Sequence, residues 1–237
     1  FYFTRFPSSA GILIVSRKQA LFLVDFRYFE KAKKEIKGIT VCLLKNTFAQ
    51  IKEVLERVET KRVLLENESL TFSEFNRYKK ELKGYEIEEE NILSKEIRDL
   101  RSIKNAEEVS FIKEAQRLTD ETFGHLLSFI TPDMSEKEVA LEMEFFMRKM
   151  GSEGVSFDFI VVSGKNSSLP HGIPTDKKIQ NGDFITMDFG AVVNGYRSDM
   201  TRTIAVGSAN DKQREVYQTV LKAQTEALKA IKPDVKC

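Results

Sequence analysis

Long hydrophobic runs, cysteine pairs and an excess of one charge are all missing from this sequence. No apolar run approaches the roughly 20 residues that a helix needs to span a bilayer. The 37 basic and 36 acidic residues leave a formal net charge of +1, which creates no general field for nucleic acid or an acidic membrane surface. Only Cys42 and Cys237 are present, too few for a disulfide framework and typical of a reducing compartment. We therefore expect a cytoplasmic protein with no nucleic-acid or membrane partner.

The first hundred residues also lack a glycine-rich turn between any strand and the following helix, which argues against a nucleotide site. Short aliphatic runs alternate there with amphipathic stretches, a pattern typical of an α/β domain with a mostly parallel sheet and crossover helices. Residues 11–15 and 20–24 flank four polar residues and predict a hairpin, and Asp25 predicts a helix cap. Further helices and strands are predicted at 26–36, 40–44, 47–58, 62–66, 72–82 and 85–87. We interpret this domain as a structural or interface domain.

A charged segment around residues 96–104 ends the alternation and leads into a long predicted helix at 105–130. The length of 237 residues favours two domains, which we place at residues 1–98 and 99–237. His125 lies on that helix beside its apolar stripe. We interpret it as a surface or edge histidine rather than a metal ligand, because no second ligand lies one turn away on the same face.

Two helix ends repeat each other in the second domain. The sequence FITPDM at 129–134 is matched by AIKPDV at 230–235, and in each the proline ends a helix. Chance similarity is the alternative, because Pro-Asp is common turn chemistry. A genuine repeat would make this domain a duplicated structure whose second copy has barely begun where the chain stops.

A predicted hairpin carries the most chemical information. An Asn-Gly pair at 194–195 lies between two strand-like runs, and a type I′ turn needs positive φ at both of its central residues. If these two residues form the loop, Val193 pairs with Tyr196 and Asp188 pairs with Thr201. Because side chains alternate with a period of two, the register decides which residues share a face.

Asp188 and Asp199 fall on one face of this hairpin, with Gly190 between them, which we expect to leave open space. They are diagonal neighbours, with about 7 to 8 Å between their backbones, so their carboxylates can converge on one ion. The opposite face is apolar, so we expect the carboxylate face to point into an enclosed site. That apolar face consists of Ile185, Met187, Phe189 and Ala191.

Two converging carboxylates repel each other and lose hydration, so one would take up a proton unless a cation lies between them. A divalent metal removes this conflict, and oxygen ligands with some imidazole suit Mn²⁺, Co²⁺, Fe²⁺ or Zn²⁺. The alternative is that Asp188 and Asp199 only accept structural hydrogen bonds on a solvated strand face.

A loop rich in glycine, serine, asparagine and proline precedes the hairpin at residues 163–174. Loops on a rigid scaffold often carry catalytic residues. This loop places His171 next to Gly172 and between Pro170 and Pro174, where the backbone has little freedom to move the imidazole. The alternative is a loop histidine whose hydrogen bonds are structural.

Several of these segments resemble one enzyme family, the Xaa-Pro peptidases with the pita-bread fold. The resemblance to the catalytic domain lies in NSSLPH at 166–171, MDFG at 187–190, GYRSDMTRT at 195–203 and IKNAEE at 103–108. The resemblance to the N-terminal domain lies in FPSSAG at 6–11 and DFRY at 25–28. It spans nearly the whole chain. It implies an α/β N-terminal domain followed by a partial α+β pita-bread catalytic domain, truncated at the C-terminus.

The resemblance also implies roles for single residues. Asp188 and Asp199 are the first two ligands of a site for two divalent metal ions, with Mn²⁺ preferred and Co²⁺ or Zn²⁺ as alternatives. His171 contacts the substrate and stabilises the tetrahedral intermediate, and Thr201 supports the ligands. The remaining ligands of the family, one histidine and two glutamates, come from later in the chain, and no histidine follows His171 here.

The implied activity is hydrolysis of the peptide bond before proline, in proline-containing peptides or dipeptides, by an aminopeptidase or dipeptidase that forms a homodimer. We expect this chain alone to be inactive, because two carboxylates are too few for a closed metal site. One alternative is a creatinase-like hydrolase of a small C–N bond. Another is a non-catalytic interaction module. Methionine aminopeptidases share the catalytic fold, but the hundred-residue leading domain disfavours them.

Overall fold

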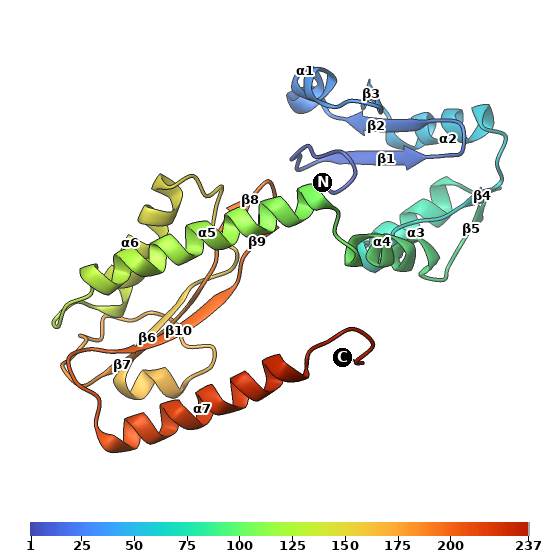
Figure 1. The fold of residues 1–237 in the computed structure, drawn as a ribbon. Coiled ribbons are helices and arrows are strands. Elements are labelled where there is room, and N and C mark those ends of the chain that lie inside the picture. Colours follow the sequence, from blue (N-terminus) through green and yellow to red (C-terminus); the bar gives the residue numbers. More distant parts are fainter. Residues whose placement is uncertain (237) are drawn as a thin grey trace. The chain divides into compact units, whose positions relative to one another are not determined.

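The computed structural model of the protein describes residues 1–236, in two compact units that divide between residues 104 and 105 (Figure 1). This division comes later than the boundary that we predicted after residue 98. The reason is that the charged segment at that boundary forms a helix, α4 (Ile92–Ser102). This helix belongs to the first unit, in which Arg98 Nη1 donates to Glu68 Oε2 at 2.6 Å.

The first unit contains every element that the sequence predicted, with ends shifted by a few residues at most. Its strands are β1 (Gly11–Val15), β2 (Ala20–Val24), β3 (Thr40–Leu43), β4 (Arg62–Val63) and β5 (Glu86–Ile87). Its other helices are α1 (Phe26–Glu35), α2 (Thr47–Arg57), the short 3₁₀ helix η1 (Asn67–Ser69) and α3 (Phe72–Glu81). Asp25 caps α1 as predicted, and its carboxylate accepts a hydrogen bond from Arg27 N at 3.0 Å.

Parallel pairing joins β2 to β3 and β4 to β5, whereas β1 and β2 form the predicted antiparallel hairpin with Val15 opposite Ala20. The parallel strands form two sheets instead of the single sheet that we expected. The second sheet is small because β4 is only two residues long and the chain then enters η1. Leu23 of β2 is 1% exposed and packs in a core with Leu82 of the segment after α3.

The second unit places three α-helices around a small sheet. Its helices are α5 (Ala106–Phe129), α6 (Glu136–Lys149), the short 3₁₀ helix η2 (Gly164–Ser168) and α7 (Asp211–Ala230). Its strands are β6 (Ile160–Ser163), β7 (Phe184–Phe189), β8 (Val192–Val193), β9 (Tyr196–Arg197) and β10 (Met200–Ala205). Capping boxes begin all three α-helices, at Asn105, Ser135 and Asn210. In the part of the chain that the structure describes, no helix is long and apolar enough to cross a membrane.

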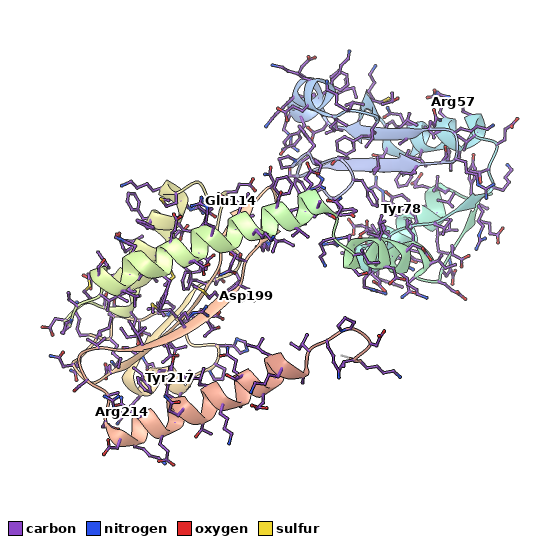
Figure 2. The ribbon with its side chains drawn as sticks, in the orientation of Figure 1. Arg57, Tyr78, Glu114, Asp199, Arg214 and Tyr217 are labelled. Atoms are coloured by element: carbon purple, nitrogen blue, oxygen red, sulfur yellow. The ribbon has the colours of Figure 1, made fainter. Side chains whose placement is uncertain are left out.

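The sheet of the second unit runs in the order β10, β7, β6, and both pairings are antiparallel. Figure 1 shows α5 and α6 on one side of this sheet and α7 on the other. The core lies on the side of α5 and α6, where Leu118 and Met143 pack against Met187 and Phe189. On the other side, the ring of Tyr217 in α7 lies 6.4 Å from the ring of Phe184 (Figure 2).

The repeated helix ends have the same backbone structure. Asp133 and Asp234 both adopt left-handed φ angles, 69° and 68°. Each turn is closed by the same type of hydrogen bond, because Met134 N donates to Thr131 O at 3.4 Å and Val235 N donates to Lys232 O at 3.4 Å. The repeat in the sequence therefore corresponds to a repeat in local structure.

Candidate metal and substrate site

The predicted register of the acidic hairpin is confirmed. Val193 pairs with Tyr196 across β8 and β9, and Asp188 pairs with Thr201 across β7 and β10. The loop residues have the positive φ angles of a type I′ turn, 48° at position 194 and 75° at position 195. The Asn-Gly pair therefore specifies the turn, and the turn specifies which side chains face each other.

The two candidate ligands lie on the face of the sheet opposite to the core. Asp188 is half-buried on the central strand β7, and Asp199 is exposed just before β10 begins (Figure 2). Thr201 Oγ1 donates to Asp188 Oδ1 at 2.8 Å, the support that the pairing predicts. The side chains of the opposite face are fully buried, as expected, at Ile185, Met187, Phe189 and Ala191.

The described residues do not form the enclosed site that we predicted. Asp199 and His171 are both exposed in this part of the chain. Only one face of the sheet packs on α5 and α6, and α7 approaches the other face at Phe184, four residues before Asp188.

Gly190 does not leave open space, which corrects our prediction. A side-chain carbon at this position would lie 1.9 Å from Ser198 O and 2.8 Å from Ser156 Oγ. Ser156 Oγ lies 2.8 Å from Ala191 O and 2.7 Å from Ser198 O, and its one proton can be donated to either carbonyl. Gly190 therefore allows two backbone segments to approach each other between the two aspartates.

A buried group of hydroxyls behind the hairpin was not predicted. Ser198 is 4% exposed, and its Oγ lies 2.6 Å from Thr119 Oγ1 of α5. The same oxygen accepts from Ala191 N at 2.8 Å and donates to Ala115 O at 3.1 Å. These contacts tie the backbone next to Asp199 to the core helix.

His171 lies in an exposed turn between η2 and the segment that returns to β7. Leu169 N donates to Asn166 O at 2.9 Å, and Gly172 N donates to Leu169 O at 3.2 Å. Gly172 is buried against Val162, because a side-chain carbon at 172 would lie 2.5 Å from Val162 Cγ1. The backbone around His171 is therefore closely packed although its imidazole is exposed.

Glu136 is a second feature that the sequence analysis missed. This carboxylate at the start of α6 is 0% exposed and accepts hydrogen bonds from Ser163, Asn166 and Thr175. Burial alone would raise the pKa of Glu136, but the hydrogen bonds from Thr175, Ser163 and Asn166 outweigh burial, and the pKa lies below its usual value of 4.5. Glu136 is therefore held as an anion beside the loop that carries His171.

His125 joins two helices, which agrees with our interpretation of it as a residue outside the metal site. Its Nε2 lies 2.6 Å from Glu142 Oε1 of α6, and its ring stacks on Phe146 with centroids 4.1 Å apart. These contacts fasten α5 to α6.

The donor set agrees in type with a divalent cation, because Asp188 and Asp199 offer carboxylate oxygens on one face. It is too small for a closed site. Within residues 1–236, no group of three or more histidine, cysteine, aspartate or glutamate side chains is placed to hold a metal ion.

Residues 110–237, more than half of the chain, match the family described as metallopeptidase family M24. The chain belongs to this family. Residues 1–103 of the M24 chain match the Creatinase/Prolidase N-terminal domain. The two matched segments lie on either side of the division between the compact units.

Three similar proteins cover nearly all of the M24 chain. The uncharacterized peptidase YqhT of Bacillus subtilis is 40% identical over 235 residues, which cover 98% of this chain and 65% of the relative. The structure of an Xaa-Pro dipeptidase from Bacillus anthracis is 41% identical, with a TM-score of 0.88, over 94% of this chain and 62% of its own. The structure of an X-Pro aminopeptidase from Thermotoga maritima is 35% identical, with a TM-score of 0.89. The match covers 96% of this chain and 64% of the aminopeptidase. The M24 chain thus spans less than two thirds of the length of these relatives.

The predicted fold class is confirmed by these matches. The first unit is the α/β domain of the creatinase and prolidase type, and the second is part of a pita-bread α+β domain. M24 enzymes are metallopeptidases, which use divalent metal ions, so the family is one of hydrolases. The acidic hairpin and the His171 loop both lie inside the matched peptidase segment.

Proposed function

We propose that the protein containing this chain hydrolyses the peptide bond that precedes proline, as an Xaa-Pro aminopeptidase or dipeptidase. The observation that carries this proposal is the pair of aspartates on one face of the β7–β10 hairpin, inside the M24 segment. The names of the similar structures, an Xaa-Pro dipeptidase and an X-Pro aminopeptidase, support the choice of proline-containing peptides as substrates.

Asp188 and Asp199 are proposed as ligands of a site for two divalent metal ions, with Mn²⁺ as the first candidate and Co²⁺ or Zn²⁺ as alternatives. When bound, such ions supply a polarised scissile carbonyl and a water whose pKa is low enough to give hydroxide near neutral pH. We propose that the whole protein adds one histidine and two glutamate ligands, since Asp188 and Asp199 are only two donors.

His171 is proposed to contact the substrate. Its exposed imidazole can donate a hydrogen bond to the carbonyl oxygen as that oxygen gains negative charge, which lowers the barrier most when the donor is already in place. Thr201 holds Oδ1 of Asp188, so the other carboxylate oxygen keeps a fixed direction. Proline has no N–H after peptide bond formation, and a pocket that accepts its ring selects such bonds.

The two compact units receive different roles in this proposal. The unit ending at Lys104 is a structural domain, and the unit beginning at Asn105 is catalytic. We also propose that the protein is a cytoplasmic homodimer. The cytoplasmic location is supported by the presence of only two cysteines, Cys42 and Cys237, at widely separated positions.

The test is cleavage of an Xaa-Pro peptide and a matched Xaa-Ala peptide by the whole protein with added Mn²⁺. We expect proline-selective, chelator-sensitive cleavage, and Asp188→Asn should lower kcat/KM by on the order of 10³-fold. Asp120→Asn, an exposed change on α5, is the matched control and should keep full activity. The 237-residue chain alone should show no turnover.

Cleavage of neither peptide despite bound Mn²⁺ would contradict the proposal. It would favour a creatinase-like hydrolase of a small C–N bond, or a binding module without catalysis. Turnover by the 237-residue chain alone would contradict only the statement that two carboxylates are insufficient.

A further inference from the structure

Glu136 has more hydrogen-bond donors around it than a carboxylate needs to begin a helix. Its Oε1 accepts from Ser163 N at 2.7 Å, Ser163 Oγ at 3.0 Å and Asn166 Nδ2 at 3.1 Å. Its Oε2 accepts from Thr175 N at 3.0 Å and Thr175 Oγ1 at 2.6 Å. The cap of α6 is formed without it, by Ser135 and Glu138. Another task must therefore account for this buried charge.

The donors lie on both sides of His171 in the sequence. Ser163 ends β6, Asn166 lies in η2, and Thr175 follows the turn that carries His171. One carboxylate thus fastens both ends of a segment of about a dozen residues to the rigid start of α6. A loop fixed at both ends has few conformations, which lowers the entropy lost when its imidazole adopts one position.

The proton positions in this cluster require an anion at residue 136. Ser163 Oγ donates to Glu136 and accepts from Lys177 Nζ at 2.8 Å. Thr175 Oγ1 donates to Glu136 and accepts from Lys177 N at 3.2 Å. A glutamine would keep one accepting oxygen, but its NH2 group would face donors in place of the other carboxylate oxygen. Lys177 Nζ also donates to Asp183 Oδ2 at 2.8 Å, so this ammonium group links the cluster to a second carboxylate.

We propose that Glu136 is a positioning residue for His171: its buried carboxylate fixes both ends of the loop from Ser163 to Thr175 and so holds the imidazole where the substrate is bound. The inference rests on the role proposed for His171. It concerns how that role is achieved, and it can fail while the proposed reaction stands.

The first test measures the imidazole itself. In the whole protein, the His171 Cε1–H signal in an NMR spectrum is assigned by its loss in His171→Asn. We expect one sharp signal in the wild type, and a broadened, shifted or doubled signal in Glu136→Gln. Glu144→Gln, an exposed change on the same helix, should leave it unchanged. An unchanged His171 signal in Glu136→Gln would overturn the proposal.

The His125 signal serves as an internal reference, because His125 contacts Glu142 and reports whether α5 and α6 still pack together. If its change shows that Glu136→Gln has not folded, Thr175→Val takes the place of that variant. This change keeps the carboxylate but removes the 2.6 Å hydrogen bond from Thr175 Oγ1. It should broaden or shift the His171 signal while the His125 signal stays the same, and no change at His171 would again count against the proposal.

The second test separates positioning of His171 from general stability. With an Xaa-Pro peptide, Glu136→Gln should lower kcat roughly 10- to 100-fold and change KM by less than about threefold. In a protein that already carries His171→Asn, Glu136→Gln should lower kcat by less than a further twofold or so, because the imidazole that Glu136 positions is absent. Equal losses in both backgrounds would overturn the proposal. If the wild type cleaves no Xaa-Pro peptide, the proposed function fails, and the NMR result alone decides the role of Glu136.

Discussion

The acidic hairpin and the His171 loop are held in place by different means, although the loop lies beside β7, one strand of the hairpin. Backbone pairing fixes Asp188, since β7 and β10 pair continuously from Phe184 to Phe189, and Asp199 directly precedes the first paired residue of β10. His171 lies outside the strands, and side-chain hydrogen bonds to one buried carboxylate fix its loop. Many backbone hydrogen bonds therefore stabilise the hairpin, whereas the His171 loop depends mainly on the hydrogen bonds to Glu136.

This difference predicts where each region is vulnerable. A paired hairpin tolerates most side-chain changes, because its hydrogen bonds come from the backbone, and it fails where two backbones touch. A loop held by one anion fails when that anion is neutralised or replaced. Substitutions in the two regions should therefore differ in how much they lower the free energy of unfolding and in how that effect depends on pH.

Gly190→Ala should give the largest effect on the hairpin. The new carbon would lie 1.9 Å from Ser198 O, so the two segments must separate, and we expect a loss of about 3 kcal/mol or more in the free energy of unfolding. The control is Gly124→Ala in α5, where nothing lies within 4 Å and alanine favours the helix by roughly 0.5 to 1 kcal/mol. Urea titration measures both. Equal stability of the two variants would show that the close approach at 190 can relax.

Glu136→Gln should have the next largest effect. We expect it to lower the free energy of unfolding by about 2 to 3 kcal/mol at neutral pH, because buried donors are left without an acceptor. The pKa of Glu136 is lowered by folding, so its stabilisation is present above the usual value of 4.5 and is lost as the pH falls below it. The gap in unfolding free energy between wild type and variant should therefore narrow as the pH falls below 4.5. A gap that stays constant with pH would mean that folding does not lower the pKa of Glu136, and a gap that widens as the pH falls would mean that this carboxyl group is protonated in the folded protein.

Ser198→Ala should have a smaller effect on the hairpin, about 1 to 2 kcal/mol. It leaves Thr119 Oγ1 without its 2.6 Å partner, although Ala191 N still has Thr119 Oγ1 at 3.3 Å. Ser110→Ala, an exposed change on α5, should stay within about 0.5 kcal/mol. Urea titration again gives both values. If Ser198→Ala lowers the free energy of unfolding no more than Ser110→Ala does, the Ser198 hydroxyl does not stabilise the hairpin.

The sequence predicts the parts of this site that local rules determine. The Asn-Gly turn and the period of two give the register, the shared face of Asp188 and Asp199 and the contact of Thr201 with Asp188. The sequence does not show which backbone segment approaches Gly190. For this reason the small residue predicts open space at a position where two segments are in contact. That distinction needs the position of Ser198 O, which pairing alone does not give.

Long-range polar clusters are the part that sequence reasoning missed. Glu136 bonds residues 27 to 39 positions away, and Ser198 meets Thr119 across 79 positions. Hydrophobic periodicity indicates which face of a helix is buried, but it does not indicate that a charged residue lies on that face with all its partners. The sequence analysis also missed the helix α4, because its few apolar residues lie among many charged ones and give a weak helical pattern.

The smallest expected change in stability separates the position of a ligand from the orientation of its carboxylate. Thr201→Val keeps a β-branched strand residue and should change the free energy of unfolding by less than about 0.5 kcal/mol, because the side chain is exposed. It removes the hydrogen bond to Asp188 Oδ1, so we expect Mn²⁺ affinity of the whole protein, measured by calorimetry, to fall roughly tenfold.

Thr203→Val is the matched control on the same strand and face, where the hydroxyl contacts Thr186 instead of an aspartate. Its Mn²⁺ affinity should equal that of the wild type. If both variants bind Mn²⁺ as tightly as the wild type, backbone pairing alone orients Asp188. If both lose affinity equally, the strand and not the hydrogen bond controls the ligand. Loss at 201 alone would show that the hairpin, whose register comes from backbone pairing, also depends on one hydroxyl for the direction of the Asp188 carboxylate.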